Sequence, residues 1–299
     1  MTTGMPLADM AESLLLPGAL SAIMLSIGLQ LKPSAFIGMV VDRRPFLVGL
    51  AGLLILSPLA GIAIAASLSP SPEVAVGLVL LATCPVGILA TVMTDLFKGS
   101  AALSIALTVV ISGVYVLLAP PIAHYAVEVA FGVSRTIVVP TMELFAKVAL
   151  VTIAPVSLGL LAARLAPTTS AQLAGPMKAI ASAILIAVFA LVVARQWSAM
   201  TETVWRIVAL VILINLVNAA LALAIARIAR LKGPDVSAIV ACHLVRQEGT
   251  AIFIAVSVLA SPEMAVPLIV NTFVGLAICA ALFAPLRGLQ GPRLKGARP

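Results

Sequence analysis

Long apolar runs that carry almost no charge recur along this chain, and they constrain its fold more than any other feature. Hydrophobic residues occupy 62% of the 299 positions, charged residues occupy 10%, and the mean hydropathy is +1.22. A soluble domain carries about 25% charged residues, so this chain lacks the side chains that a water-facing surface needs. The lipid bilayer is therefore expected to be part of its solvent.

The apolar runs form nine segments when they are read between charged residues and Pro- or Gly-rich breaks. At about 20 residues per crossing, the chain has room for roughly nine to ten helices. The runs do not alternate apolar and polar residues, as barrel strands would. The sequence predicts an all-α membrane protein with spans near 13–31, 45–68, 73–97, 101–127, 137–164, 177–195, 204–229, 236–260 and 264–286.

The basic residues between these segments, with a few inside them, predict the orientation of the chain. Loops rich in Lys and Arg stay in the cytoplasm. One predicted side holds Lys32, Arg43, Arg44, Lys98, Arg164, Lys178, Arg227, Arg230, Lys232, Arg287, Arg293, Lys295 and Arg298. The other side holds only Arg135, Lys147, Arg195 and Arg206. We expect an outside N-terminus and a cytoplasmic C-terminus. This topology also accounts for the net charge of +7 without a nucleic-acid partner.

Two of the segments are broken in their middle by residues that a lipid-facing helix avoids. Pro85 and Gly87 interrupt the third segment, which predicts unwinding near 84–88. A polar cluster that ends at Gly249 interrupts the eighth. A shift of 162 residues carries Gly87 onto Gly249, while the predicted direction of the segment reverses. Matching breaks in oppositely directed segments are typical of inverted-repeat transporters.

The polar cluster of the eighth segment places Arg246 and Glu248 in mid-membrane. Each such charge costs at least about 2.5–3.5 kcal/mol on insertion scales, and charges of this kind usually serve transport. The alternative is a mutually neutralising pair that only braces the chain. His243 lies one turn before Gln247 on the same helix face, either as a proton-responsive ligand or as a hydrogen-bonded core histidine.

Other polar residues have ordinary structural explanations beside functional ones. Ser104 and Thr108 share a face of the fourth segment and either serve the site or bond to the helix backbone. We expect Asn215, Asn218 and Asn271 to form interhelical hydrogen bonds. No P-loop, dinucleotide-binding glycine pattern, HExxH or GxSxG motif is present, which disfavours an ATP-driven pump, a common hydrolase and any enzyme. No cofactor and no protein-bound metal are predicted.

Several stretches resemble the bile acid:sodium symporter family. They are IMLSIGLQLKPSAF at 23–36, PSPEVAVGLVLLATCPVG at 70–87 and TVMTDLFKGSAALSIALT at 91–108, together with the broken eighth segment. The resemblance implies the inverted-repeat fold of sodium/proton antiporters, in which two discontinuous helices cross. It implies a panel domain from 13–31 and 137–195, a core domain from 45–127 and 204–286, and a basic tail at 287–299.

The resemblance also shows where this chain departs from the family. Aligned through the matched stretches, the polar pair after the first break becomes Ala90 and Thr91. The sodium-binding glutamate becomes His243, and the core-helix glutamine becomes Leu53. Of the expected polar positions only Ser104, Thr108 and Gln247 remain. Arg246 falls where the family offers a carbonyl to sodium, so we hypothesise that its charge replaces one sodium ion.

Taken together, these features predict a secondary transporter of a small organic anion, of the carboxylate type, in a bacterial inner membrane. Transport would be independent of sodium, and either uncoupled or coupled to protons through Glu248 or His243. The positive ends of the half-helices near 87–91 and 249–252 are candidate sites for the anionic group. The alternatives are a cation/proton antiporter that uses Glu248, a sodium-coupled symporter with an altered site, and a membrane receptor without transport.

Overall fold

The computed structural model describes residues 14–30, 43–132, 141–200 and 203–289. Every regular element within these ranges is helical, as the sequence predicts. Six helices are long and apolar enough to cross a membrane: Arg43–Leu68, Ala101–Phe131, Ala146–Leu165, Pro167–Leu191, Val204–Ile228 and Pro262–Phe283. Three shorter apolar helices cover Leu16–Gln30, Pro72–Thr83 and Gly249–Val258. The all-α membrane class is therefore confirmed, while a count of nine spans stays a prediction.

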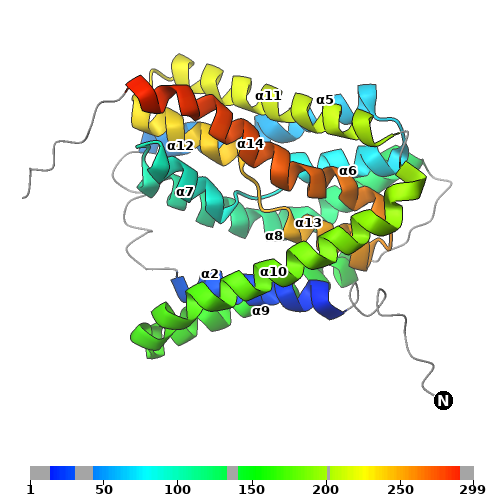
Figure 1. Ribbon diagram of the computed structural model, residues 1–299, viewed down its shortest axis with the longest axis horizontal. Helices are drawn as coiled ribbons and strands as arrows, with labels where there is room; N and C mark the ends of the chain where they lie inside the picture. The colour runs from blue at the N-terminus through cyan, green and yellow to red at the C-terminus, as the bar shows by residue number, and fades with distance from the viewer. Residues whose placement is uncertain (1–13, 31–42, 133–140, 201–202, 290–299) are drawn as a thin grey trace, which may run out of the picture.

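The described helices are arranged as Figure 1 shows. The first half of the chain contains α2 (Leu16–Gln30), α4 (Arg43–Ala51), the π-helical turn η2 (Gly52–Leu56), α5 (Ser57–Leu68), α6 (Pro72–Thr83), α7 (Ile88–Leu96) and α8 (Ala101–Phe131). The second half contains α9 (Thr141–Leu165), α10 (Pro167–Met200), α11 (Val204–Ile228), α12 (Gly233–Leu244), α13 (Gly249–Phe253), the π-helical turn η3 (Ile254–Val258), the 3-10 helix η4 (Pro262–Ala265) and α14 (Val266–Leu289).

The predicted start of the sixth segment at residue 177 was wrong, because α10 begins ten residues earlier at Pro167. Pro176 lies inside the helix without ending it. Membrane proteins tolerate proline in helices because neighbouring groups satisfy the freed backbone. Lys178, which the sequence placed on the cytoplasmic side at the start of this segment, consequently lies well inside a helix that is apolar enough to span the membrane.

Helices α2, α9 and α10 pack against one another; α2 and α9 lie along the lower side of Figure 1, and α10 runs diagonally upward from its lower left. Gly28 of α2 and Gly159 of α9 allow the closest approach: a Cβ built on Gly28 would clash with the Val156 carbonyl oxygen and lie 3.0 Å from the Cα of Gly159. On the other side of α2, Ser26 Oγ donates to the Ala174 carbonyl of α10 at 2.8 Å. Small residues and interhelical hydrogen bonds of this kind drive helix association in membranes.

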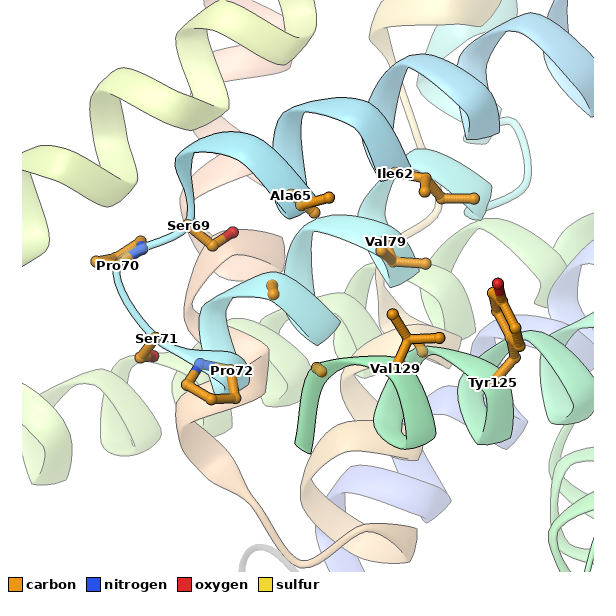
Figure 2. Close-up of a pocket in the computed structure, with 13 residues that line it drawn as sticks. Ile62, Ala65, Ser69, Pro70, Ser71, Pro72, Val79, Tyr125 and Val129 are labelled. Atoms are coloured by element: carbon orange, nitrogen blue, oxygen red, sulfur yellow. The ribbon is translucent and has the colours of Figure 1, made fainter. Parts of the chain in front are cut away.

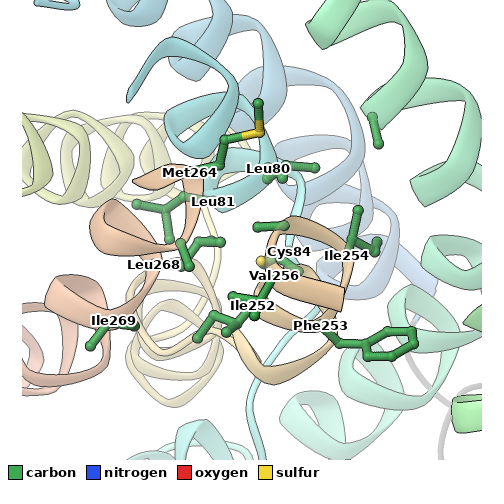
Figure 3. Packing of buried hydrophobic residues seen from close by; sticks show 14 of the residues in the cluster. Leu80, Leu81, Cys84, Ile252, Phe253, Ile254, Val256, Met264, Leu268 and Ile269 are labelled. Carbon is green, nitrogen blue, oxygen red and sulfur yellow. The ribbon is translucent and has the colours of Figure 1, made fainter. Parts of the chain in front are cut away.

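The same hydrophobic core continues from α2, α9 and α10 to α6, α13, η3 and α14, which bury their side chains together (Figure 3). Leu80, Ile252 and Leu268 have no exposed surface. Ser71 starts α6, because its Oγ accepts a hydrogen bond from Val74 N–H and Pro72 occupies the first turn. This packing fixes the inner ends of α6 and α13, which lead to the site described below.

Replacing Gly28 with alanine is expected to lower the stability of the protein. The added methyl group would meet the Val156 carbonyl oxygen, so α2 would have to move away from α9. Overpacking of this kind costs about 1–3 kcal/mol. The midpoint of thermal unfolding in a non-ionic detergent measures the loss.

Gly18→Ala is the matched control, because it lies in the same helix and nothing lies within 4 Å of its built Cβ. Both variants gain the same helix propensity, about 1 kcal/mol per Gly→Ala change. The control is therefore expected to keep or raise the midpoint, and equal midpoints in the two variants would contradict the close packing of α2 on α9.

Candidate functional site

Two helices are interrupted at their middle, and both breaks fall where the sequence predicts them. Helix α6 ends at Thr83 and α7 begins at Ile88. Helix α12 ends at Leu244 and α13 begins at Gly249. Cys84, Gly87 and Val245 have extended backbones between the half-helices, so their backbone groups are available to partners outside a helix.

The two extended segments cross and pair through their backbones as an isolated antiparallel bridge. The Gly87 N–H donates to the Val245 carbonyl at 2.9 Å, and the Gln247 N–H donates to the Pro85 carbonyl at 2.9 Å. A Cβ on Gly87 would lie 2.7 Å from the Arg246 carbonyl oxygen. Glycine is needed here because only a residue without a side chain lets the segments approach this closely. Pro85, which lacks an N–H, contributes its carbonyl instead.

The Arg246 side chain joins the inner ends of both broken helices. Its Nε donates to the His243 carbonyl at 3.0 Å, and its Nη1 donates to the Cys84 carbonyl at 3.0 Å. Its Nη2 donates to Ser57 Oγ, which itself donates to the Ala82 carbonyl at 3.1 Å. Arg246 is only 7% exposed. The guanidinium therefore satisfies carbonyls at the ends of α6 and α12, where helix dipoles place partial negative charge.

Glu248 takes a different set of partners. Asn271 of α14 donates to Glu248 Oε1 at 2.6 Å, and Asn215 of α11 donates to Asn271 Oδ1 at 2.6 Å. The predicted interhelical bonding of Asn215 and Asn271 is confirmed. Asn218 instead donates to the Ile214 carbonyl of its own helix. Glu248 is thus held by an amide chain from two neighbouring helices.

The hydrogen bonds of Arg246 and Glu248 bear on the alternative of a mutually neutralising pair. Although the chain unwinds between α12 and α13, each side chain bonds to groups other than its charged neighbour. Gln247 lies between them and is partly buried. These hydrogen bonds therefore do not join the Arg246 guanidinium to the Glu248 carboxylate, as a mutually neutralising pair would require.

His243 is buried in the bundle, with 1% of its surface exposed. Its Nδ1 lies 2.8 Å from the Ile239 carbonyl oxygen of its own helix. Its Nε2 faces Gly52, where a built Cβ would lie 2.5 Å from that nitrogen. The predicted helix face shared with Gln247 was wrong, because α12 ends at Leu244 and the helical spacing is lost. The geometry fits the core-histidine interpretation of this residue.

The remaining positions aligned with family sodium sites bond to each other. Thr91 Oγ1 and Ser104 Oγ lie 3.1 Å apart, and Ser104 Oγ lies 3.4 Å from Cys242 Sγ. Thr108 Oγ1 donates to the Ser104 carbonyl at 2.8 Å, as the backbone interpretation predicted. The other two positions are apolar and buried: Leu53 and Ala90. A hard cation prefers several oxygen ligands with negative charge nearby, and this set offers no carboxylate.

A cavity of about 350 Å³ lies beside the crossing. One wall belongs to the crossing and to α14, and it carries Arg246, Gln247 and Glu248. The opposite wall belongs to α2 and α10, and it carries Lys178 and Ser182. Gly87 and Gly249 also line the cavity. The structure therefore joins the two sequence-predicted breaks and the charged cluster in one place.

Lys178 is the charged cavity residue whose role the sequence interpretation missed, and Ser182 was missed with it. The helix neighbours of Lys178 show a signal that would have found it: Ala174, Ala181 and Leu185 lie at helical spacing from it and are buried. A lysine in that register belongs to the inward face of α10. The signal was hidden because the helix was expected to begin at residue 177.

Other cavities lack the chemistry of this one. A cavity of about 430 Å³ between α5, α6 and α8 has mostly apolar walls, including Ile62, Val79 and Val129, and no charged lining residue (Figure 2). Another of about 460 Å³ lies beside the start of α12 and includes Lys98 and Phe283. Neither contains the broken-helix crossing, so the cavity beside Arg246 is the candidate site.

Comparison with known proteins shows the family of the chain. A stretch of 101 residues is 36% identical to the "Uncharacterized sodium-dependent transporter YocS" of Bacillus subtilis (strain 168). The match covers 34% of this chain and 30% of that protein. The sequence profile of the Sodium Bile acid symporter family matches residues 17–230, which is well over half of the chain. The chain is therefore a multi-pass membrane protein and belongs to the Sodium Bile acid symporter family of transporters.

Proposed function

We propose that this protein is a secondary active transporter that carries a small organic anion by alternating access. The observation that carries the proposal is the cavity between the broken-helix crossing and α10, because it combines apolar walls with positive side chains. Family membership supports the same class of activity. A carboxylate suits the site, since Lys178, Arg246 and Gln247 are donors of the kind that bind anionic oxygens.

The proposed architecture has nine spans, a panel of α2, α9 and α10, and a core of the other helices. The packing of α2 against α9 and α10 supports the panel. The antiparallel pairing of two broken helices supports an inverted repeat like that of sodium/proton antiporters. The basic residues support an outside N-terminus and a cytoplasmic C-terminus in a bacterial inner membrane.

In this proposal Arg246 takes the place of a sodium ion, so transport is independent of sodium. A guanidinium that bonds to the Cys84 and His243 carbonyls supplies a positive charge where the ends of two helices need one. The hydroxyls that remain at sodium-site positions are engaged with each other and with the backbone. A sodium ion would have to compete with these bonds without help from a carboxylate.

Two other functions have observations in their favour. Sodium-coupled anion symport is favoured by the family and by the description of the Bacillus subtilis relative as a sodium-dependent transporter. Cation/proton antiport is favoured by the buried carboxylate of Glu248 on its amide chain. We rank both below sodium-independent anion transport, because Arg246 and Lys178 make the cavity repel cations.

Sodium is expected to have no specific effect on the wild-type protein. A sodium site with a Kd of about 1 mM would add about 2.7 kcal/mol of stability at about 100 mM sodium. We expect equal unfolding midpoints in sodium chloride and choline chloride. In proteoliposomes, uptake of radiolabelled 2-oxobutanoate and 4-methyl-2-oxopentanoate should not change when sodium replaces choline.

Arg246→Ala should destabilise the protein by about 1–3 kcal/mol for each carbonyl left unpaired. Arg246→Lys is the control, since it keeps the charge and loses the planar set of donors.

The same variant tests sodium independence in proteoliposomes. If the wild type takes up the anion only with sodium, and if Arg246→Ala abolishes that uptake, the proposal that transport is independent of sodium is overturned. Absence of flux for every carboxylate tested would favour a receptor without transport.

Glu248→Gln is expected to uncouple uptake from an inward pH gradient. Glutamine keeps an acceptor for Asn271 but cannot bind and release a proton at neutral pH. The stimulation of 2-oxo acid uptake by external acid should fall about tenfold, while uptake at equal pH persists. Glu263→Gln, at an exposed residue, is the matched control and should retain the stimulation. Full stimulation in Glu248→Gln would contradict proton coupling through this residue.

A further inference from the structure

Lys178 lies on the inward face of α10, within a segment apolar enough to span the membrane. Ala174 and Ala181, which flank it at helical spacing, are 1% and 2% exposed. Lys178 is itself partly buried and lines the cavity. Charged residues inside membrane segments are rare, and those that face a cavity usually mark the path of a substrate or ion. Ser182 follows one turn later and lines the same cavity.

The charges around the cavity do not balance. Its lining includes two cations, Lys178 and Arg246, and one carboxylate, Glu248, which leaves one positive charge when Glu248 is ionised. All three types of guanidinium nitrogen in Arg246 donate to groups of the protein. Three of the five N–H groups of Arg246 are thus used within the protein, and Lys178 is the cation that the wall of α2 and α10 offers to a ligand in the cavity. A single negative charge on the ligand would make the occupied cavity neutral.

The rest of the wall around Lys178 is apolar. Ile23 comes from α2, while Leu185, Ile186 and Phe189 come from α10. Leu89 and Leu276 face them from α7 and α14. The volume of about 350 Å³ lies near the lower end of the range for small-molecule sites, roughly 300–1,000 Å³. The lining thus fits a compact apolar body that carries one charged group.

From these observations we infer that Lys178, assisted by Ser182, selects the charge of the substrate, and that the substrate class is a compact apolar monocarboxylate. This inference rests on the proposed transport of an organic anion and names the residue that sets its specificity. A dicarboxylate would leave a second charge in apolar surroundings, and a neutral amide would leave the ammonium without a counter-charge.

The test uses the full-length protein in a non-ionic detergent and three matched sets of probes. Butanoate, hexanoate and benzoate are the monoanions. Butanamide, hexanamide and benzamide are their neutral counterparts, and succinate, adipate and terephthalate are the dianions. Binding is measured as the rise in unfolding midpoint with ligand concentration. At least one monocarboxylate is expected to bind about tenfold more tightly than its amide and than its dicarboxylate counterpart. A tenfold difference in affinity corresponds to the free energy of about one hydrogen bond to a charged group.

Lys178→Gln should remove that preference and weaken binding of the monocarboxylate about tenfold, whereas Lys178→Arg should retain both. Lys232→Gln is the matched control, because Lys232 is exposed and does not line this cavity. Unchanged unfolding midpoints of the unliganded variants would show that the effect does not come from misfolding.

The outcomes separate the inference from the function on which it rests. Tighter binding of a dicarboxylate, or unchanged monocarboxylate binding in Lys178→Gln, would overturn the role of Lys178 and leave anion transport standing. If no anion of either charge raises the midpoint of the wild type, the proposed organic-anion function fails, and this inference fails with it.

Discussion

The guanidinium of Arg246 holds together the part of the molecule on which the rest depends. Interrupting a helix inside a membrane leaves carbonyl groups without water to bond them, and each such group costs several kcal/mol. A planar side chain with five N–H donors can serve carbonyls from two helices at once. Arg246 reaches Cys84 at the end of α6 and His243 near the end of α12. The breaks, the crossing and the cavity beside it are compatible with a stable bundle because these groups are paired.

This arrangement has a consequence for energy coupling. A bound ion enters and leaves during each transport cycle, but a side chain stays where it is. If Arg246 fills the position of a sodium ion, that position cannot draw free energy from a sodium gradient. Any coupling must then come from a group that changes its charge, and Glu248 is the carboxylate that lines the cavity. Its bond to Asn271 holds it in place without fixing its charge state, because an amide can also donate to a neutral carboxyl oxygen.

The sequence predicted local features well and spatial neighbours poorly. Pro85 and Gly87 act on their own backbone, so the break could be placed without knowledge of the fold. The partners of Arg246 and Glu248 could not, because Ser57 lies 189 residues from Arg246 and Asn271 belongs to another helix. Lys178 was missed for a related reason. The role of Lys178 depends on where α10 begins and on which face of α10 points inward. Both depend on residues before 177, which the sequence interpretation left outside the helix.

The two walls of the cavity carry charges of different kinds, and this bears on how substrate binding and movement are linked. Lys178 belongs to the group of α2, α9 and α10, whereas Arg246 and Glu248 belong to the crossing. A ligand can shift a conformational equilibrium only by its difference in affinity between the states. In the proposed cycle a monoanion contacts Lys178 on one wall and the crossing on the other, so its binding energy depends on their separation. The states that bring the walls together around the anion are therefore favoured by the same charge that selects it.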